Sequence, residues 1–470
     1  MTHAVSIRKT LAIAVLIDLL VVTSCFTIGF QNIQEHDPFI YITFGINGLL
    51  WMFFLLLEVK EKAYSLAMIF WFFCLFFFFF AGLIQTMNNQ FPWIGMYEDN
   101  ELLKTNIVLF VWSILFQVGI HIGGKTRFVI IPKKNIDNTR YLNWSVSAHC
   151  LIILLILSVL IMAYRINSVG FINLLARGTS AFATSENASI AVLLEKVMMA
   201  IVYFAFVLSV YHWRERKVVF PMVMSGICFV LSYFPTSTAR SAAAGLYFGA
   251  MLVLFPKMRK SAAFVIMYAL VFMFVFPLFN AFRTETIGNV DMLMALGLIL
   301  SNFSSGWLAV DYDAYSMVSL TLRYISLHGV EFGRQLLGVL FFWIPRSIWP
   351  SKPESSGPVV ADYFGWWFTN VSEPLPAEMI INFGVVGMAF AALVCGFFIR
   401  KLDDKYWNFR DDKTLNVTKY DSLYLYMIGY FLFLYRGSLL AAVAYLIAFV
   451  FVWLLIPASR TSGQHVNIVR

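Results

Sequence analysis

Charged residues are scarce in this sequence of 470 residues. Asp, Glu, Lys and Arg together make up 13% of it, whereas soluble globular proteins have about 25%. Hydrophobic residues reach 60%, aromatic residues reach 17%, and the mean hydropathy is +0.77. So few charges cannot cover a water-exposed surface. We therefore exclude a soluble protein and predict an all-α polytopic membrane protein that forms a single integral membrane domain over residues 1–470.

The signatures of soluble enzymes are also absent. The sequence contains no phosphate-binding glycine loop, no GxSxG elbow, no HExxH and no nucleotide-binding fingerprint. Its five cysteines lie in or beside apolar segments and form no CxxC pair, so we expect neither a disulfide framework nor a metal site. We expect no cofactor either. Any substrate is expected to arrive through the lipid bilayer.

Twelve apolar segments approach the roughly 20 residues that a membrane-spanning helix needs. The predicted spans are 11–30, 39–57, 64–84, 105–122, 146–164, 191–211, 218–234, 241–256, 262–280, 380–398, 421–438 and 439–457. Between the ninth and tenth spans lies a long segment, 281–379, which we predict to be an extracytoplasmic loop. Two apolar stretches within it, Met292–Val310 and Leu336–Trp343, are too short or too interrupted to span and are predicted to be interfacial or re-entrant helices.

The basic residues predict the orientation of these spans. The net charge is +8, and most of the 34 basic residues fall in loops that are cytoplasmic if both termini are cytoplasmic, as the positive-inside rule requires. We therefore expect no nucleic-acid partner. The remaining basic residues are eight arginines and three lysines: Arg165, Arg177, Arg240, Arg283, Arg323, Arg334, Arg346, Arg436, Lys104, Lys196 and Lys352. Arginine suits bidentate binding of phosphate or carboxylate, although salt bridges on the outer surface would use the same residues.

Four sequence blocks in this order carry a family resemblance. They are FPTSTARS (Phe234–Ser241), IPRSIWPSKP (Ile344–Pro353), EMIINFGVVG (Glu378–Gly387) and YRG (Tyr435–Gly437). Together they resemble the Wzy-type O-antigen and oligosaccharide repeat-unit polymerases, and the second block resembles them most strongly.

The resemblance implies a function and a place in the cell. It implies a glycosyltransferase of the bacterial inner membrane with a GT-C-like helical architecture and an active site facing the periplasm or the cell exterior. Such an enzyme transfers a growing glycan from undecaprenyl diphosphate onto the non-reducing end of the next lipid-linked repeat unit. A chain-length co-polymerase of the Wzz type is implied as a partner.

Cleavage of a sugar from a lipid diphosphate builds negative charge on the leaving group. Fixed guanidinium groups in a site of low dielectric constant would stabilise that charge. Our first choices for this role are Arg240, Arg346 and Arg436, of which Arg240 opens a small-residue span. Arg283, Arg323 and Lys352 are further candidates for binding the diphosphate or a sugar carboxylate.

An acceptor hydroxyl can require a general base on the same face of the membrane. The candidates are Asp311, Asp313, His328, Glu331, Asp362 and Glu378. We prefer Glu378, which directly precedes a predicted span and follows Pro374 and Pro376, where partial burial disfavours the ionised form. A carboxylate at this place can equally be an interfacial anchor or the partner of an arginine.

Aromatic residues of the long loop are candidates for sugar binding, because their rings stack on the apolar faces of pyranoses. These residues are Trp343, Trp349, Tyr363, Trp366 and Trp367. The same residue types favour the membrane interface, so an interfacial belt is the alternative role.

Two other functions fit the same composition. One is a GT-C glycosyltransferase that uses a polyprenyl-phosphate sugar, for which the acidic QEHD stretch at 34–37 would supply carboxylates and a divalent metal site. The other is a lipid-linked oligosaccharide flippase. Transporters commonly show internal repeats and ionisable groups near the membrane midplane, whereas here the two halves differ and the polar residues gather outside the spans.

Overall fold

The computed structural model is helical, as predicted, apart from one short strand pair among the residues that it describes. These residues are 36–93, 97–126, 144–145, 147–175, 188–235, 237–259, 261–271, 306–407, 419–457 and 459–460. The strand pair joins β1 (Trp144–Ser145) to β2 (Ser459–Arg460) in antiparallel register. The predicted span at 11–30 lies outside the described residues.

The helices belong to two compact units, each built from segments that are distant in sequence. Unit 1 contains α2 (Pro38–Glu61), α3 (Leu66–Phe73), the π-helix η1 (Cys74–Phe80), α4 (Ala81–Met87), α5 (Asp99–Lys125), α10 (Ser261–Leu270) and α16 (Leu375–Trp407). Unit 2 contains α6 (Ala148–Val169), η2 (Ile172–Leu175), α7 (Ala188–Arg216), α8 (Phe220–Ser232) and α9 (Arg240–Leu254), while η3 (Pro256–Arg259) starts in unit 2 and continues in unit 1. Two further helices, α17 (Lys419–Arg436) and α18 (Leu439–Leu455), contribute residues to both units.

Six helices in the described part of the chain are long and apolar enough to cross a membrane. They are α2, the continuous helix from α3 to α4, α5, α6, α7 and α16. At about 1.5 Å per residue, each covers the hydrocarbon thickness of about 30 Å. Three apolar helices, α8, α9 and α18, are shorter. The protein is therefore a helical, multi-pass membrane protein.

Aspartate side chains cap the first turns of two of the long helices. Asp37 caps α2 by accepting a hydrogen bond from the Phe39 amide, and Pro38 supplies a first residue that needs no amide donor. Asp403, near the end of α16, accepts hydrogen bonds from the first two amides of α3, at 2.8 and 3.2 Å. A carboxylate is stable at that place because it faces the positive end of the helix dipole.

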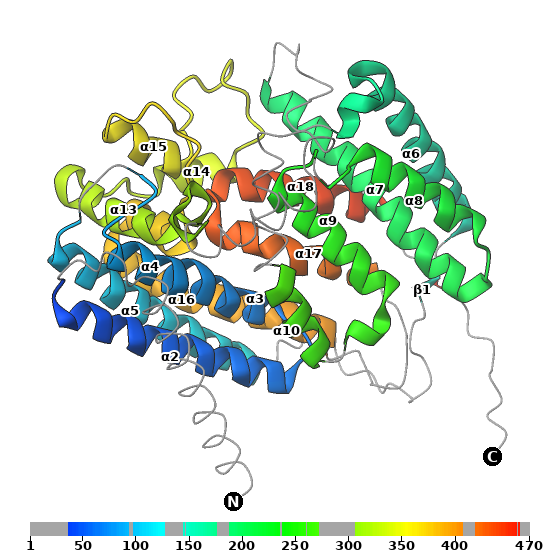
Figure 1. Ribbon diagram of the computed structural model, residues 1–470. Helices are drawn as coiled ribbons and strands as arrows, with labels where there is room; N and C mark the ends of the chain where they lie inside the picture. The colour runs from blue at the N-terminus through cyan, green and yellow to red at the C-terminus, as the bar shows by residue number, and fades with distance from the viewer. Residues whose placement is uncertain are drawn as a thin grey trace, which may run out of the picture. The chain divides into compact units, whose positions relative to one another are not determined.

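Helices α5 and α16 pack with their backbones in close contact (Figure 1). A Cβ atom at Gly119 would overlap the Leu393 carbonyl oxygen, and one at Gly396 would overlap the Phe116 carbonyl oxygen. Small residues at such contacts allow membrane helices to approach closely and gain dispersion energy. This pair of glycines therefore fixes α16 against α5.

The segment predicted as a long loop contains further helical structure. From residue 306 onward it forms η6 (Gly306–Leu308), η7 (Val310–Tyr312), α13 (Ala314–His328), α14 (Arg334–Leu340) and α15 (Ser356–Tyr363). Helix α13 packs against α4, η1 and α15. The predicted helix Leu336–Trp343 overlaps α14, whose seven residues extend only about 10 Å and cannot cross a bilayer. Most of the predicted helix Met292–Val310 lies outside the described residues.

Candidate functional site

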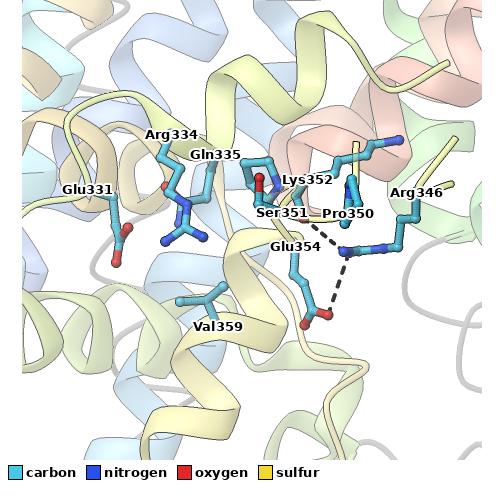
Figure 2. Close-up of a pocket in the computed structure, with 10 residues that line it drawn as sticks. Glu331, Arg334, Gln335, Arg346, Pro350, Ser351, Lys352, Glu354 and Val359 are labelled. Atoms are coloured by element: carbon cyan, nitrogen blue, oxygen red, sulfur yellow. Dashed lines mark hydrogen bonds and ion pairs between the residues drawn. The ribbon is translucent and has the colours of Figure 1, made fainter. Parts of the chain in front are cut away.

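A cavity of about 290 Å³ that is lined by several charged residues lies in unit 1 beside α14 and α15 (Figure 2). It is lined by Glu331, Arg334, Gln335, Arg346, Pro350, Ser351, Lys352, Pro353, Glu354 and Val359. Three basic and two acidic residues thus line one pocket. Two of the cations, Arg346 and Lys352, come from the IPRSIWPSKP block that carries the strongest resemblance.

Arg346 and Lys352 hold the irregular segment that contains them. The guanidinium of Arg346 donates a hydrogen bond to the Lys352 carbonyl at 2.9 Å and lies 3.5 Å from Glu354 Oε1. The Lys352 ammonium donates to the carbonyls of Phe342 and Ile344 at 2.5 and 3.0 Å. Because prolines remove backbone donors from this segment, these side chains supply donors that its carbonyl groups need. Partial burial, and then the charge of Arg346, lower the pKa of Lys352.

Arg334 is the cation that remains available in the pocket. It is the first residue of α14, and its side chain is exposed. Figure 2 shows its guanidinium pointing into the space bounded by Glu331, Val359 and Glu354. No hydrogen bond or ion pair engages that guanidinium among the described residues. The neighbouring Gln335 is 3% exposed, and its amide oxygen has no hydrogen-bond partner in the same part of the chain.

A kink in α16 positions the loop that carries Arg334. Gly384 has φ 67° and ψ −172°, a conformation that only glycine adopts readily. The helical hydrogen bonds across it are interrupted, and the carbonyls of Ile381 and Asn382 accept instead from the amides of Glu331 and Gly333, at 2.8 and 3.2 Å. The kink therefore anchors the backbone that leads into α14.

Glu331 is the pocket carboxylate that contacts no arginine or lysine side chain at hydrogen-bond distance among the described residues. Its Oε1 accepts a hydrogen bond from the Tyr324 hydroxyl at 2.6 Å and lies 3.6 Å from His328 Nδ1. The ring of Tyr363 packs edge-on against both Tyr324 and His328, with centroids 4.9 and 5.7 Å apart. Glu331 is thus held by aromatic groups, whereas Glu354 is paired with Arg346.

Glu378, our preferred general base, is buried and fully engaged. It is 1% exposed. Its Oε2 accepts from the Ser356 hydroxyl at 2.5 Å, and its Oε1 accepts from the Leu439 amide at 2.6 Å and from the Ser438 hydroxyl at 3.4 Å. Leu439 is the first residue of α18, so Glu378 caps this helix and connects it to α15 and α16. This geometry favours a structural role over proton transfer to substrate.

Glu373 is a buried carboxylate that our sequence analysis missed. It is 0% exposed; its Oε1 accepts from the Thr321 hydroxyl at 2.7 Å, and its Oε2 has no hydrogen-bond partner among the described residues. Burial, and then the carboxylates of Glu378 and Asp313, raise the pKa of Glu373 well above its usual range. Its only sequence signal was its position between Ser372 and Pro374 in the same polar segment.

Arg436, a first-choice diphosphate ligand, forms a buried ion pair. Its Nη2 lies 2.9 Å from Asp313 Oδ1, and its guanidinium also donates to the carbonyls of Asp311 and Val310 at 2.9 and 3.3 Å. Asp313 is 1% exposed and accepts further hydrogen bonds from the Trp93 indole and the Ser372 amide. Arg436 therefore fixes the start of α13 rather than lining the basic pocket.

Of the other cations predicted to bind the diphosphate, the structure describes the side-chain contacts of Arg323 only. Arg323 forms a bidentate pair with the Glu101 carboxylate, at 2.7 and 2.5 Å, and this pair raises the pKa of Arg323. Arg240 is the first residue of α9 in unit 2, but its side chain lies outside the described part of the structure. Arg283 lies outside the described residues altogether.

The predicted aromatic residues divide by exposure. Trp343, Trp367 and Tyr363 are 63%, 91% and 43% exposed. Trp349 donates its indole hydrogen to Ser351, and Trp366 stacks on Trp93 with ring centroids 5.4 Å apart. Trp343, Trp367 and Tyr363 thus have ring surface that is exposed for contact.

The acidic stretch at 34–37 is partly described. His36 Nδ1 lies 2.6 Å from Asp99 Oδ1, and the other oxygen of Asp99 accepts from the Asp37 amide at 2.8 Å. Since Asp37 also caps α2, these groups secure the starts of α2 and α5. Of the other two residues of this stretch, Gln34 and Glu35, the structure describes neither.

Comparison of the chain with known protein families, with curated proteins and with solved structures finds no match. One exposed guanidinium, two further cations and a neighbouring carboxylate in one cavity can bind an oxyanion and accept a proton beside it.

Proposed function

We propose that this chain is a lipid-linked oligosaccharide repeat-unit polymerase of the Wzy type. It transfers the growing glycan from undecaprenyl diphosphate onto the non-reducing end of the next lipid-linked repeat unit. The main support is that the Ile344–Pro353 block, which resembles the family most strongly, lines the basic pocket together with Arg334.

The reaction makes clear demands on such a pocket. The bond between the sugar and the diphosphate oxygen breaks, and the diphosphate leaves with the bonding electrons. The acceptor hydroxyl oxygen forms the new glycosidic bond and loses its proton. Arg334 meets the departing diphosphate, because its guanidinium is exposed in the pocket, while Arg346 and Lys352 hold the loop and add positive charge. Fixed charges of this kind stabilise the transition state without reorganisation.

The acceptor proton goes to Glu331 in this proposal. Glu331 lines the pocket, and the Tyr324 hydroxyl and His328 hold its carboxylate. Glu378 is assigned a positioning role, because both of its oxygens already accept hydrogen bonds. The exposed rings of Trp343, Tyr363 and Trp367 are available for stacking on sugars.

The proposed setting is the bacterial inner membrane. The chain has about twelve spans in a GT-C-like arrangement, both termini are cytoplasmic, and the pocket faces the periplasm or the cell exterior. The support is the predicted distribution of lysine and arginine and the six membrane-crossing helices. A Wzz-type co-polymerase would set the chain length.

The deciding experiment is a lipid-linked and surface glycan profile of a deletion strain. Loss of a polymerase leaves exported glycan carrying a single repeat unit, whereas loss of a flippase leaves lipid-linked units on the cytoplasmic side. Complementation with Arg334→Gln should leave single-unit glycan, because the exposed guanidinium is gone. Arg400→Gln is the matched control, because Arg400 pairs with Glu61 at 3.0 Å on another part of unit 1, and it should restore long chains.

Two results would contradict the proposal. Long-chain glycan in the deletion strain would exclude a polymerase. Loss of transfer on chelation of divalent cations, with Arg334→Gln fully active, would favour the GT-C glycosyltransferase that uses a polyprenyl-phosphate sugar.

A further inference from the structure

Two basic side chains of unit 2 are buried. Arg165 of α6 is 4% exposed, and Lys196 of α7 is 9% exposed. Both helices are apolar enough to cross a membrane. Arg165 lies four residues before the end of α6, about 6 Å along its axis. Lys196 lies eight residues after the start of α7, about 12 Å along its axis.

The contacts of these cations are incomplete. Arg165 Nη1 lies 3.7 Å from Glu195 Oε1, and its guanidinium carbon lies 4.8 Å from the centre of the Tyr233 ring. Lys196 Nζ lies 4.6 Å from the centre of the Tyr445 ring. In the part of the chain that the structure describes, neither Nε nor Nη1 of Arg165 has a hydrogen-bond partner.

These contacts do not satisfy a buried guanidinium. A separation of 3.7 Å is too long for a hydrogen bond, the Tyr233 ring attracts the cation without accepting a strong hydrogen bond, and the Tyr233 hydroxyl is a single neutral acceptor for a guanidinium with five N–H donors. Arg165 and Lys196 also repel each other, and the single charge of Glu195 offsets only one of them. Charges at membrane depth are costly unless paired. An anion with several oxygen acceptors would satisfy the donors that have no partner among the described residues.

The surroundings indicate that this anion is carried by a lipid. Three apolar residues close to the buried cations in sequence are exposed. Leu160 and Tyr164, five residues and one residue before Arg165 on α6, are 59% and 41% exposed. Leu194, two residues before Lys196 on α7, is 47% exposed. An exposed apolar surface of this kind suits an acyl or polyprenyl chain. A phosphoryl group has enough oxygens to contact a guanidinium and an ammonium together.

We infer that Arg165 and Lys196 bind the phosphoryl group of a membrane lipid, at a site separate from the basic pocket of unit 1. The Glu195 carboxylate competes with this lipid for Arg165, so it lowers the affinity of the site for lipid. The inference rests on the contacts in unit 2 and does not require the polymerase proposal.

The test is a binding titration of the purified full chain in uncharged detergent, followed by native mass spectrometry. The probes are phosphatidylglycerol, undecaprenyl phosphate and inorganic pyrophosphate. We expect both lipids to bind the wild type. Arg165→Gln and Lys196→Met should each weaken lipid binding by roughly tenfold or more, since a hydrogen bond to a charged group has about that effect on affinity.

Two variants make the test specific. Arg214→Gln is the matched control: Arg214 lies on α7 as Lys196 does, but donates to the Val253 and Leu254 carbonyls, so lipid binding should be unchanged. Glu195→Gln should bind lipid severalfold more tightly, because it removes the competing charge. A purely structural ion pair would give the opposite result, a less stable protein with no gain in affinity.

Each outcome decides the inference. Equal lipid affinity of the wild type and Arg165→Gln overturns it, as does weaker or unchanged binding in Glu195→Gln. If Arg165→Gln does not fold, the opposite changes expected for Lys196→Met and Glu195→Gln carry the test. Binding of pyrophosphate that depends on Arg165, without lipid binding, supports phosphoryl recognition and overturns the lipid source.

Discussion

Replacement of Arg436 by glutamine is expected to destabilise unit 1 strongly. The substitution removes the partner of Asp313, which is 1% exposed and lies 2.9 Å from the guanidinium. Breaking a buried ion pair costs about 3–5 kcal/mol, because the remaining charge stays in a site of low dielectric constant. Arg436 is 23% exposed, and Asp313 keeps the Trp93 indole and the Ser372 amide as donors. We therefore expect the lower end, about 3 kcal/mol.

Companion variants separate charge from geometry. Arg436→Lys keeps the charge but cannot reach Asp311, Val310 and Asp313 together, so we expect a loss of about 1–2 kcal/mol. Asp313→Asn removes the stranded charge. The double variant Arg436→Gln with Asp313→Asn should therefore lose about 2 kcal/mol less than the sum of the single variants.

The assay is reversible unfolding of the purified protein in mixed micelles with increasing sodium dodecyl sulfate. Arg400→Gln is the control, because its partner Glu61 is 59% exposed, and we expect a loss of about 0–1 kcal/mol. A loss below about 1 kcal/mol for Arg436→Gln, or strict additivity in the double variant, would refute the assignment of a coupled buried pair.

Three further predictions concern the interior and backbone of unit 1. Because burial raises the pKa of Glu373 above 4.5, the folded state binds this proton more tightly than the unfolded state, and wild-type stability should fall as pH rises above about 4.5. Glu373→Gln should flatten this pH dependence of stability, measured from unfolding curves at a series of pH values. An unchanged slope in the variant would contradict the prediction. Glu378→Gln should retain glycan chain growth, whereas Glu378→Ala should lower the stability of the protein by about 1–2 kcal/mol because the helix cap is lost. A glutamine variant that is stable but inactive would instead support Glu378 as the general base. Gly384→Ala should cost about 1–3 kcal/mol, because alanine strains at φ 67°, and wild-type stability in the same unfolding assay would contradict the kink.

Composition and segment length were enough to predict the class of the protein. The hydrocarbon layer accepts only apolar side chains and internally bonded backbone, so long apolar segments predict membrane helices without any knowledge of their partners. Residue type and order also drew attention to the Ile344–Pro353 block. Its proline content predicted irregular backbone, and the structure places Arg346 and Lys352 of this block in the basic pocket.

The partners of charged groups were beyond prediction. Arg436 pairs with Asp313, 123 positions away, and Arg323 pairs with Glu101, 222 positions away. Neither pair follows a local sequence pattern, because the two residues of each pair come together only when separate helices pack. This packing commits Arg323 and Arg436 to carboxylates of the protein itself.

The roles of several residues depend on tertiary structure that the sequence does not reveal. Arg334 enters the pocket because the kink at Gly384 frees two carbonyls, which hold the loop before α14. Glu373 stands out only because folding buries it, and Arg165 only because its buried Nε and Nη1 have no hydrogen-bond partner among the described residues. The sequence by itself thus determined that the chain is a helical membrane protein and where its polar segment lies. The tertiary structure alone decided which charges are paired and which are open to a ligand, because burial and pairing arise from contacts between distant segments.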